Sequence, residues 1–355
     1  MARIRLQNIN KKFGEYAALT DVSVDVADGE FFVLLGPTGA GKTTTLRLIA
    51  GLDKPTSGDI YINDADVGQW GPAERDTALV LQQYSLYPRL TVRDNLAFPL
   101  RSRVRQMSAE DIEKRIAYAS KTLRIEHLLE RKTDRLSGGE MQRVSIGRAI
   151  VREPQVFLMD EPLSALDAKL REALRIELKD LQMRLGATFI FVTHDQVEAM
   201  TMGDRIGVLN KGRIVQIGTP QQVYNNPRDT FVASFVGSPA INLFSGNISS
   251  GRAVMSPKTF ELPIETSTEG AFTFGIRPED VRVESGAPVE AKVHDIENHG
   301  IEKILTLRVA DHLVRAGVPA KVNVAVEDTV RFGWNPGKVI LFDQKTGMNI
   351  GHKAA

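Results

Sequence analysis

A short apolar segment followed by a glycine-rich loop is the most constraining feature of this sequence. Residues 31–35 read FFVLL, an uninterrupted apolar run typical of a strand that is buried on both faces of a sheet. The loop at 36–43 has the pattern Gly-x-x-x-x-Gly-Lys-Thr, and apolar residues then recur at helical spacing. This strand, loop and helix predict a P-loop, in which backbone N–H groups and the positive end of a helix dipole bind phosphate.

Two side chains of the loop have expected roles at a bound nucleoside triphosphate. Lys42 is expected to reach the β- and γ-phosphates, and the Thr43 hydroxyl is expected to ligate Mg²⁺. A glycine-rich turn with an ordinary surface lysine is the alternative, which the flanking strand and helix disfavour. The expected phosphate-binding residues are Gly36, Pro37, Thr38, Gly39, Ala40, Gly41, Lys42, Thr43 and Thr44.

Length and composition indicate a globular protein of two domains. At 355 residues the chain exceeds the size at which a single hydrophobic core usually stops growing. The formal net charge of +1 gives no overall field that favours nucleic acid, and the lack of cysteine excludes disulfide and thiolate chemistry. No apolar run approaches the roughly 18 residues that span a bilayer, and the first residues do not resemble a signal peptide. Any membrane role is therefore expected to use a partner's helices.

Apolar periodicity predicts an α/β domain built on a mainly parallel sheet. Further buried strands are expected at 156–159 and 188–192, with a long amphipathic helix between them that is marked by leucines from Leu166 onward. A small antiparallel β layer is expected within residues 3–35, and a hairpin within 205–218.

The rest of the chain divides into a helical and an all-β part. Residues 88–152 look mostly helical, and one helix is expected to begin after Ser108, a typical capping residue. Short valine-rich segments with turn signals in the last third of the chain predict an all-β domain, a small barrel. The expected domains are therefore 1–235, with the helical subdomain at about 88–152, and 236–355.

Carboxylates and a histidine directly follow two of the expected strands. Asp160 could hold Mg²⁺, usually through water, and Glu161 could polarise an attacking water. His194 could donate a hydrogen bond to the γ-phosphate. Adjacent acids at a strand end are commonly just solvated, and a lone histidine is more often structural. A P-loop in the same sheet favours the catalytic interpretation.

A second glycine-rich segment, Leu136-Ser137-Gly138-Gly139-Glu140, precedes the helical run MQRVSIGRAIV and forms another candidate anion site. Between a P-loop and a DEP segment, it resembles the signature of ATP-binding cassette (ABC) proteins. The resemblance extends to LSALD at 163–167, which matches the family's D-loop, and to LQQYSLYP at 81–88, which matches its Q-loop. One departure is Glu140, where the commonest signature residue is glutamine.

The resemblance implies a site shared between two copies of the chain that close head to tail around ATP. Ser137, Gly138 and Gly139 of one copy then face the P-loop of the other, and Asp167 of the D-loop also contributes. In the same family Phe13 falls where an aromatic ring stacks on adenine. The implied catalytic residues are Glu161 as the base, with His194, Lys42 and the sensor Gln82, and the implied Mg²⁺ ligands are Thr43, Gln82 and Asp160.

The C-terminal part resembles that of importer ATPases for sugars, glycerol phosphate and related solutes. The similar segments are FVASFVGSPAINLFSG at 231–246 and FGIRPEDV at 274–281. In that subgroup the extension is an oligonucleotide-binding-type barrel, described as TOBE- or MOP-like, which helps to pair two subunits and can receive regulators.

The subgroup implies a place and a set of partners for this chain. We expect a homodimeric, peripheral ATPase on the cytoplasmic face of the plasma (inner) membrane, under two integral-membrane permease subunits and indirectly served by an extracytoplasmic solute-binding protein. A groove beside the Q-loop that includes Leu86 and Tyr87 is where relatives receive a permease helix. No nucleic acid is expected. The alternatives are an ATPase of a polyamine, sulfate or iron importer, and a soluble ABC ATPase acting on ribosomes or DNA.

Overall fold

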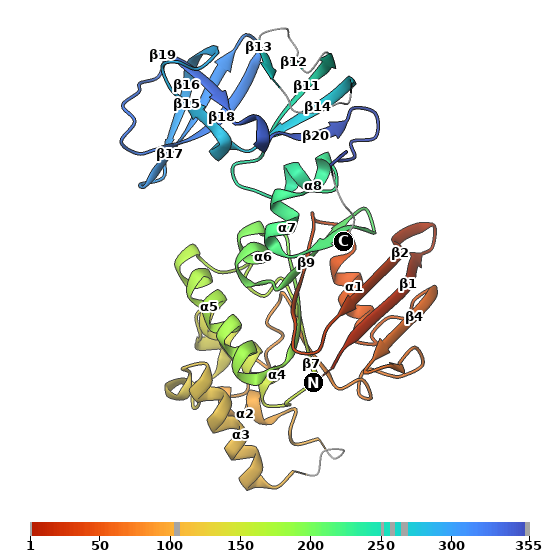
Figure 1. Cartoon of the computed structure of the whole chain (residues 1–355). Helices are drawn as coiled ribbons and strands as arrows, with labels where there is room; N and C mark the ends of the chain where they lie inside the picture. Colours follow the sequence, from red (N-terminus) through yellow and green to blue (C-terminus); the bar gives the residue numbers. More distant parts are fainter. Residues whose placement is uncertain (1, 103–106, 250–251, 256–259, 264–268, 352–355) are drawn as a thin grey trace. The chain divides into compact units, whose positions relative to one another are not determined.

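The computed structural model describes the whole chain except residues 1, 103–106, 250–251, 256–259, 264–268 and 352–355 (Figure 1). The chain divides into two compact units, Met1–Pro220 and Gln221–Ala355. The first unit therefore ends before residue 235, the boundary expected from the sequence. The helices α7 (Pro220–Asn225) and α8 (Thr230–Phe235) group largely with the second unit. Arg277 contributes to this grouping, because its guanidinium donates hydrogen bonds to backbone carbonyls of both helical segments, at Tyr224 and Ala233.

The first unit contains a six-stranded sheet in the order β10-β9-β3-β8-β7-β6. The pairs β6–β7, β7–β8, β3–β8 and β3–β9 are parallel, and β10 pairs antiparallel to β9 as a hairpin. The parallel sheet and the hairpin that the sequence predicts are thus confirmed. The strands are β3 (Phe31–Leu35), β6 (Thr77–Val80), β7 (Val156–Asp160), β8 (Thr188–Thr193), β9 (Arg205–Asn210) and β10 (Arg213–Gly218).

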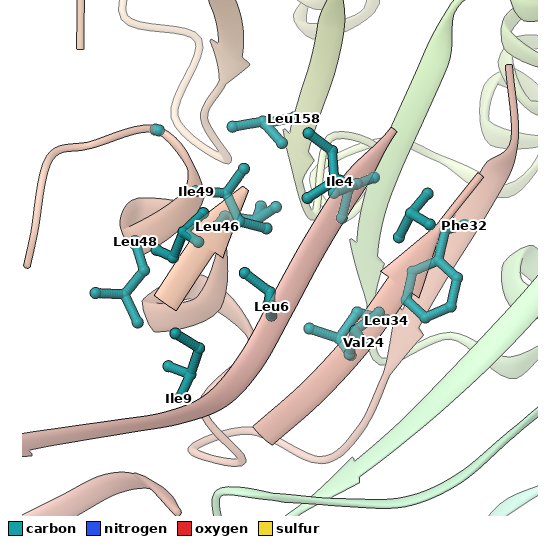
Figure 2. Close-up of a cluster of buried hydrophobic side chains, with 14 of the residues drawn as sticks. Ile4, Leu6, Ile9, Val24, Phe32, Leu34, Leu46, Leu48, Ile49 and Leu158 are labelled. Atoms are coloured by element: carbon teal, nitrogen blue, oxygen red, sulfur yellow. The ribbon is translucent and has the colours of Figure 1, made fainter. Parts of the chain in front are cut away.

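A four-stranded antiparallel sheet forms the predicted β layer of the same unit, in the order β2-β1-β4-β5. Its strands are β1 (Ile4–Phe13), β2 (Tyr16–Val26), β4 (Ser57–Ile62) and β5 (Ala65–Asp66). One apolar cluster joins this sheet to the six-stranded sheet through the helix α1 (Lys42–Ile49), as Figure 2 shows. The helix that follows the P-loop is therefore held on two sides by buried apolar side chains.

The helices of the first unit confirm the expected helical regions (Figure 1). Ser108 caps α3, where its hydroxyl accepts a hydrogen bond from the Asp111 N–H. The long amphipathic helix begins at Ala168, after the cap Asp167, so Leu166 lies ahead of it and not within it. The helices are α2 (Val92–Ala97), α3 (Ala109–Thr122), α4 (Gly138–Ile150), α5 (Ala168–Leu185) and α6 (Gln196–Met202), with 3₁₀ turns at Glu126–Leu128 and Thr133–Arg135.

The second unit is all-β apart from α7, α8 and short 3₁₀ turns, as the sequence predicts. Two five-stranded antiparallel sheets, ordered β13-β12-β11-β14-β20 and β15-β19-β16-β17-β18, enclose one core that contains Phe244, Phe274, Phe332 and Trp334. The strands are β11 (Asn242–Ser249), β12 (Arg252–Met255), β13 (Phe260–Pro263), β14 (Gly270–Ile276), β15 (Val281–Val283), β16 (Val289–Asn298), β17 (Glu302–Val309), β18 (His312–Pro319), β19 (Thr329–Trp334) and β20 (Ile340–Asp343).

A buried arginine fixes the C-terminal end of α1. The Arg75 side chain is 2% exposed and donates to the carbonyls of Leu48, Ile49, Val67 and Trp70, over 2.6 to 3.2 Å. The first two carbonyls belong to the last turn of the helix, where carbonyl groups lack partners within the helix itself. Its positive charge also lies at the negative end of the helix dipole. Arg75 thus holds the far end of the helix that carries the P-loop lysine.

We expect Arg75→Met to loosen α1, because several buried carbonyl groups lose their donor at once. Local opening should become easier by about 2 kcal/mol, or about thirtyfold faster hydrogen exchange at the α1 amides. Hydrogen–deuterium exchange of the full chain would measure it. Arg47→Met is the matched control, since Arg47 forms a partly exposed pair with Asp53 and should change exchange little. Equal exchange in the two variants would contradict the assigned role of Arg75.

Candidate active site

A cleft of about 510 Å³ lies where the P-loop meets the ends of strands β7 and β8. It brings together residues that are far apart in the sequence, including Phe13, Gln82, Glu161 and His194. Predicted P-loop residues that line it are Thr38, Gly39, Gly41, Lys42, Thr43 and Thr44. Most of the predicted nucleotide site is therefore assembled in one place within the first unit.

The P-loop lysine is buried and folds back over its own loop. Lys42 is 5% exposed, and its Nζ donates to the carbonyls of Gly36 (2.9 Å) and Pro37 (3.1 Å). The same Nζ lies 3.2 Å from Glu161 Oε1 in an ion pair. Gly41 allows this turn, because it caps α1 with a φ of 107°, a region that favours glycine. The ammonium group is thus held at the start of α1. A phosphate bound there would be attracted both by this ammonium and by the positive end of the helix dipole.

Asp160 and Thr43 place two side-chain oxygens beside the lysine. The Thr43 hydroxyl donates to Asp160 Oδ1 over 3.0 Å. Burial raises the pKa of Asp160, and the neighbouring Glu161 charge adds to that rise, while the Thr43 hydrogen bond opposes it. A divalent cation bound here would favour the charged form of Asp160, because its positive charge offsets both the burial of the carboxylate and the repulsion from Glu161. The donor set, a carboxylate and a hydroxyl, suits Mg²⁺, which prefers oxygen ligands.

Glu161 lies between the lysine and the predicted histidine. His194 Nδ1 donates to Glu161 Oε2 over 2.8 Å, while Oε1 faces Lys42. Glu161 adopts a φ of 44°, in the left-handed region that is uncommon for residues other than glycine. Its N–H donates to the carbonyl of Val192 on β8, which fixes this turn at the end of β7. The backbone therefore aims the carboxylate into the cleft, with a cation on one side and an imidazole on the other.

Two aromatic residues line the open side of the cleft. Phe13 is 48% exposed, and the Lys11 ammonium lies 4.7 Å from its ring centroid. Tyr16, which sequence reasoning missed, is opposite Phe13 across the turn between β1 and β2 and also lines the cleft. The signal was available, because a hairpin turning at Gly14 places the flanking aromatic residues in register. Tyr16 is thus a second aromatic candidate for contact with a nucleotide base.

The signature residues are not part of this cleft. Ser137 caps α4 and forms a capping box with Glu140, so that Gly138 and Gly139 make the first turn of the helix. Asp167 caps α5 by accepting the Leu170 N–H over 3.0 Å. None of the predicted signature and D-loop residues lines the cleft of its own chain.

A buried acid behind the histidine was also missed. Glu198 on α6 is 3% exposed, and it accepts a hydrogen bond from the Thr193 hydroxyl over 2.5 Å. The same hydroxyl oxygen accepts the Asp195 N–H, so the two residues that flank His194 are tied to one another. Burial raises the pKa of Glu198. The sequence signal was a charged residue four positions after His194, on the inward face of a short helix.

Comparison with known proteins gives a consistent result for both units. Two family models match, that of the ABC transporter at residues 19–164 and that of the TOBE domain at 274–342. The trehalose/maltose import ATP-binding protein MalK of Thermococcus litoralis is 46% identical, with 99% of this chain and 100% of the relative covered. The sn-glycerol-3-phosphate import ATP-binding protein UgpC of Brucella abortus is also 46% identical, over 96% and 97% of the two chains.

Solved structures resemble the first unit. The dimeric ATP-binding cassette MJ0796 bound to ADP and Pi, in a post-hydrolysis state, has a TM-score of 0.55 and 35% identity, covering 61% of this chain and 98% of that one. Among the residues that the structure describes, no helix is long and apolar enough to cross a lipid bilayer. With a P-loop cleft in the first unit and relatives of matching length, the chain belongs to the family of ABC importer ATP-binding subunits and is a nucleotide-binding ATPase.

Proposed function

We propose that this chain drives the import of a sugar or a sugar derivative, glycerol phosphate included. The observation that carries the proposal is similarity along nearly the whole chain, TOBE domain included, to subunits named for such solutes. Besides the two relatives above, the xylose/arabinose import ATP-binding protein XacJ of Haloferax volcanii is 43% identical over 99% of this chain. In this proposal the solute passes through partner subunits and does not touch this chain.

The cleft supports specific roles in ATP hydrolysis. Lys42 and the P-loop N–H groups would bind the phosphates, and Thr43, Asp160 and Gln82 would hold Mg²⁺, which neutralises phosphate charge when bound. Gln82 is near enough to the catalytic segment for its Nε2 to donate to the Ser164 hydroxyl over 3.3 Å. Glu161 would accept the proton of the attacking water, and His194 would orient the γ-phosphate.

The proposed general base is engaged by two neighbouring side chains. The Glu161 carboxylate contacts Lys42 on one oxygen and His194 on the other. The phosphates of ATP would attract the Lys42 ammonium and so free one carboxylate oxygen for water. Binding of ATP and activation of Glu161 would then occur together, because Lys42 contacts the phosphates and releases the carboxylate in the same movement.

The separation of the signature from the cleft supports a head-to-tail dimer. Ser137 and the two following glycines lie at the N-terminus of α4, where the first-turn backbone N–H groups have no partner within the helix itself. Since they do not line their own cleft, a second copy would bring them to the phosphates of the first. The solved MJ0796 cassette is itself described as dimeric.

An exposed apolar patch beside the Q-loop supports coupling to a permease at the cytoplasmic face of the membrane. Tyr87 is 36% and Phe98 is 49% exposed, and their ring centroids lie 4.3 Å apart. The guanidinium of Arg148 lies 4.8 Å from the Tyr87 ring centroid. Rigid aromatic residues beside an arginine are typical of the energetic centres of protein interfaces. Leu86 is half-buried next to this patch.

The test is to isolate a tagged copy from detergent-solubilised native membranes and identify its companions by mass spectrometry. We expect two integral-membrane permease chains with two copies of this protein.

Leu86→Arg should reduce the recovered amount of the permease chains at least tenfold while the variant still binds ATP, because a charge is buried in the interface. Lys12→Gln, on strand β1 and not among the residues of the patch, is the control. Recovery of ribosomes or nucleic acid without a membrane protein would contradict the importer assignment, and an unchanged Leu86→Arg complex would contradict this docking site.

A further inference from the structure

Glu140 and Ser137 form a closed hydrogen-bonded pair at the N-terminus of α4. Glu140 Oε2 accepts the Ser137 N–H over 2.7 Å and the Ser137 hydroxyl over 2.8 Å. Ser137 Oγ in turn accepts the Glu140 N–H over 3.4 Å. The Ser137 backbone hydrogen bond, assisted by that of the hydroxyl, lowers the pKa of Glu140. Glu140 is therefore an ionised carboxylate at neutral pH.

The number of protons shared by the Ser137 hydroxyl and the Glu140 carboxylate determines which acceptor the hydroxyl can serve. A serine hydroxyl carries one proton, and an ionised carboxylate carries none and can only accept. The Ser137 proton is therefore directed to Glu140 and is not available to another acceptor. A γ-phosphate supplied by a second copy presents only acceptor oxygens, and it adds negative charge close to the Glu140 carboxylate.

A glutamine at the same position would distribute the protons differently. Its amide has both a donor and an acceptor. The carbonyl oxygen could accept the Ser137 N–H, as Glu140 does now, while the NH₂ group donates to Ser137 Oγ. The serine proton would then be free to point toward a phosphate, and the helix cap would persist, since glutamine also forms capping boxes.

We propose that Glu140 restrains closure of the ATP-bound dimer by holding the proton of Ser137. The inference rests on the proposed function, in which Ser137 of one copy faces ATP in the cleft of the other. Closure requires the Ser137 hydroxyl to turn from Glu140 to the γ-phosphate. The hydroxyl then exchanges its hydrogen bond to one charged acceptor for a hydrogen bond to another. Closure also brings two negative groups together. The chain therefore needs more ATP to close than it would with a neutral amide at this position.

The first test is steady-state ATP hydrolysis by the full-length chain. Glu140→Gln should lower the ATP concentration for half-maximal hydrolysis about fivefold, because a competing charged acceptor is removed. The control is Asp111→Asn on α3, where the Ser108 hydroxyl donates to Asp111 Oδ2 over 2.7 Å and accepts the Asp111 N–H over 3.1 Å. This pair repeats the two hydrogen bonds between a serine hydroxyl and an acidic residue at a helix N-terminus outside the signature segment, so the control should leave the ATP dependence unchanged.

The second test repeats the substitution in a Ser137→Ala background, where there is no hydroxyl proton to release. The gain from Glu140→Gln should be clearly smaller there, because only the charge repulsion between Glu140 and the phosphate is then relieved. A gain of the same size would overturn the proposal, because charge alone would then explain it, and an unchanged ATP dependence in the single variant would overturn it as well. If Ser137→Ala alone hydrolyses ATP like the wild type, the head-to-tail site itself is wrong. That result is distinct from a failure of Glu140 alone.

Discussion

Glu161→Gln is expected to abolish nearly all ATP hydrolysis while ATP binding persists. Glutamine keeps the shape of the side chain but cannot accept the proton of an attacking water. Loss of a general base lowers turnover by about 10²- to 10⁴-fold. The ion pair of Glu161 with Lys42 is also lost, which leaves the ammonium free for the phosphates of ATP. Hydrolysis assays and equilibrium nucleotide binding on the same preparation measure the two effects separately.

The same variant should accumulate as a closed dimer when ATP is present, because the step that reopens it no longer occurs. Sedimentation with and without ATP would detect the change. The matched control is Glu30→Gln, another mostly buried acid, which lies at the opposite end of β3 and accepts the Ala27 N–H. It should keep wild-type turnover. Turnover above about a tenth of wild type in Glu161→Gln would refute the assignment of the base.

The meeting of Lys42, Glu161 and His194 in one cleft is predictable from sequence because two independent signals coincide there. Lys42 belongs to a spaced glycine motif, whereas Glu161 and His194 directly follow apolar segments. Such segments read as buried strands, and parallel neighbours bring their carboxyl ends to one edge of the sheet. The spacing of the glycine motif indicated phosphate binding, and the expected parallel strands indicated that Glu161 and His194 lie at the same edge of the sheet.

Contacts between polar groups could not be predicted in the same way. Apolar periodicity reports which side chains are buried but not which polar partners reach them. Nothing in the sequence indicated that Arg75 is enclosed by carbonyl groups, or that Glu198 holds the Thr193 hydroxyl. The boundary between the units was misplaced for the same reason, since a change in composition follows α8 whereas Arg277 binds that helix from beyond it.

The contact between Glu161 and Lys42 is the clearest example of a polar contact that the sequence does not predict. Sequence reasoning gave both residues a role at the nucleotide, but it could not show that they pair with each other. In the proposed mechanism that pairing would link phosphate binding by Lys42 to the release of the Glu161 carboxylate. It is therefore a property of the folded arrangement and not of either motif.

Gly36→Ala is expected to weaken ATP binding by at least about 100-fold, although Gly36 contributes no side chain. A methyl group at this position would lie 2.3 Å from the carbonyl oxygen of Leu209 on β9. That oxygen belongs to the backbone of a central strand, so the P-loop must move away from it. A displaced loop loses several converging N–H groups and the aim of Lys42, at about 1 to 3 kcal/mol each. Equilibrium ATP binding, with thermal unfolding as a check on folding, measures the loss.

Gly39→Ala distinguishes the effect of a steric clash from the effect of an unfavourable backbone conformation. Gly39 has a φ of 80° but open space around the position of an added methyl group. The substitution should therefore cost only the strain of a left-handed residue, about 1 to 2 kcal/mol, and weaken ATP binding by about tenfold. Both variants add the same group to the same loop, so the difference between them reports the contact with Leu209. Equal losses would contradict the role assigned to the close approach to β9, because Gly36, unlike Gly39, does not adopt a left-handed φ.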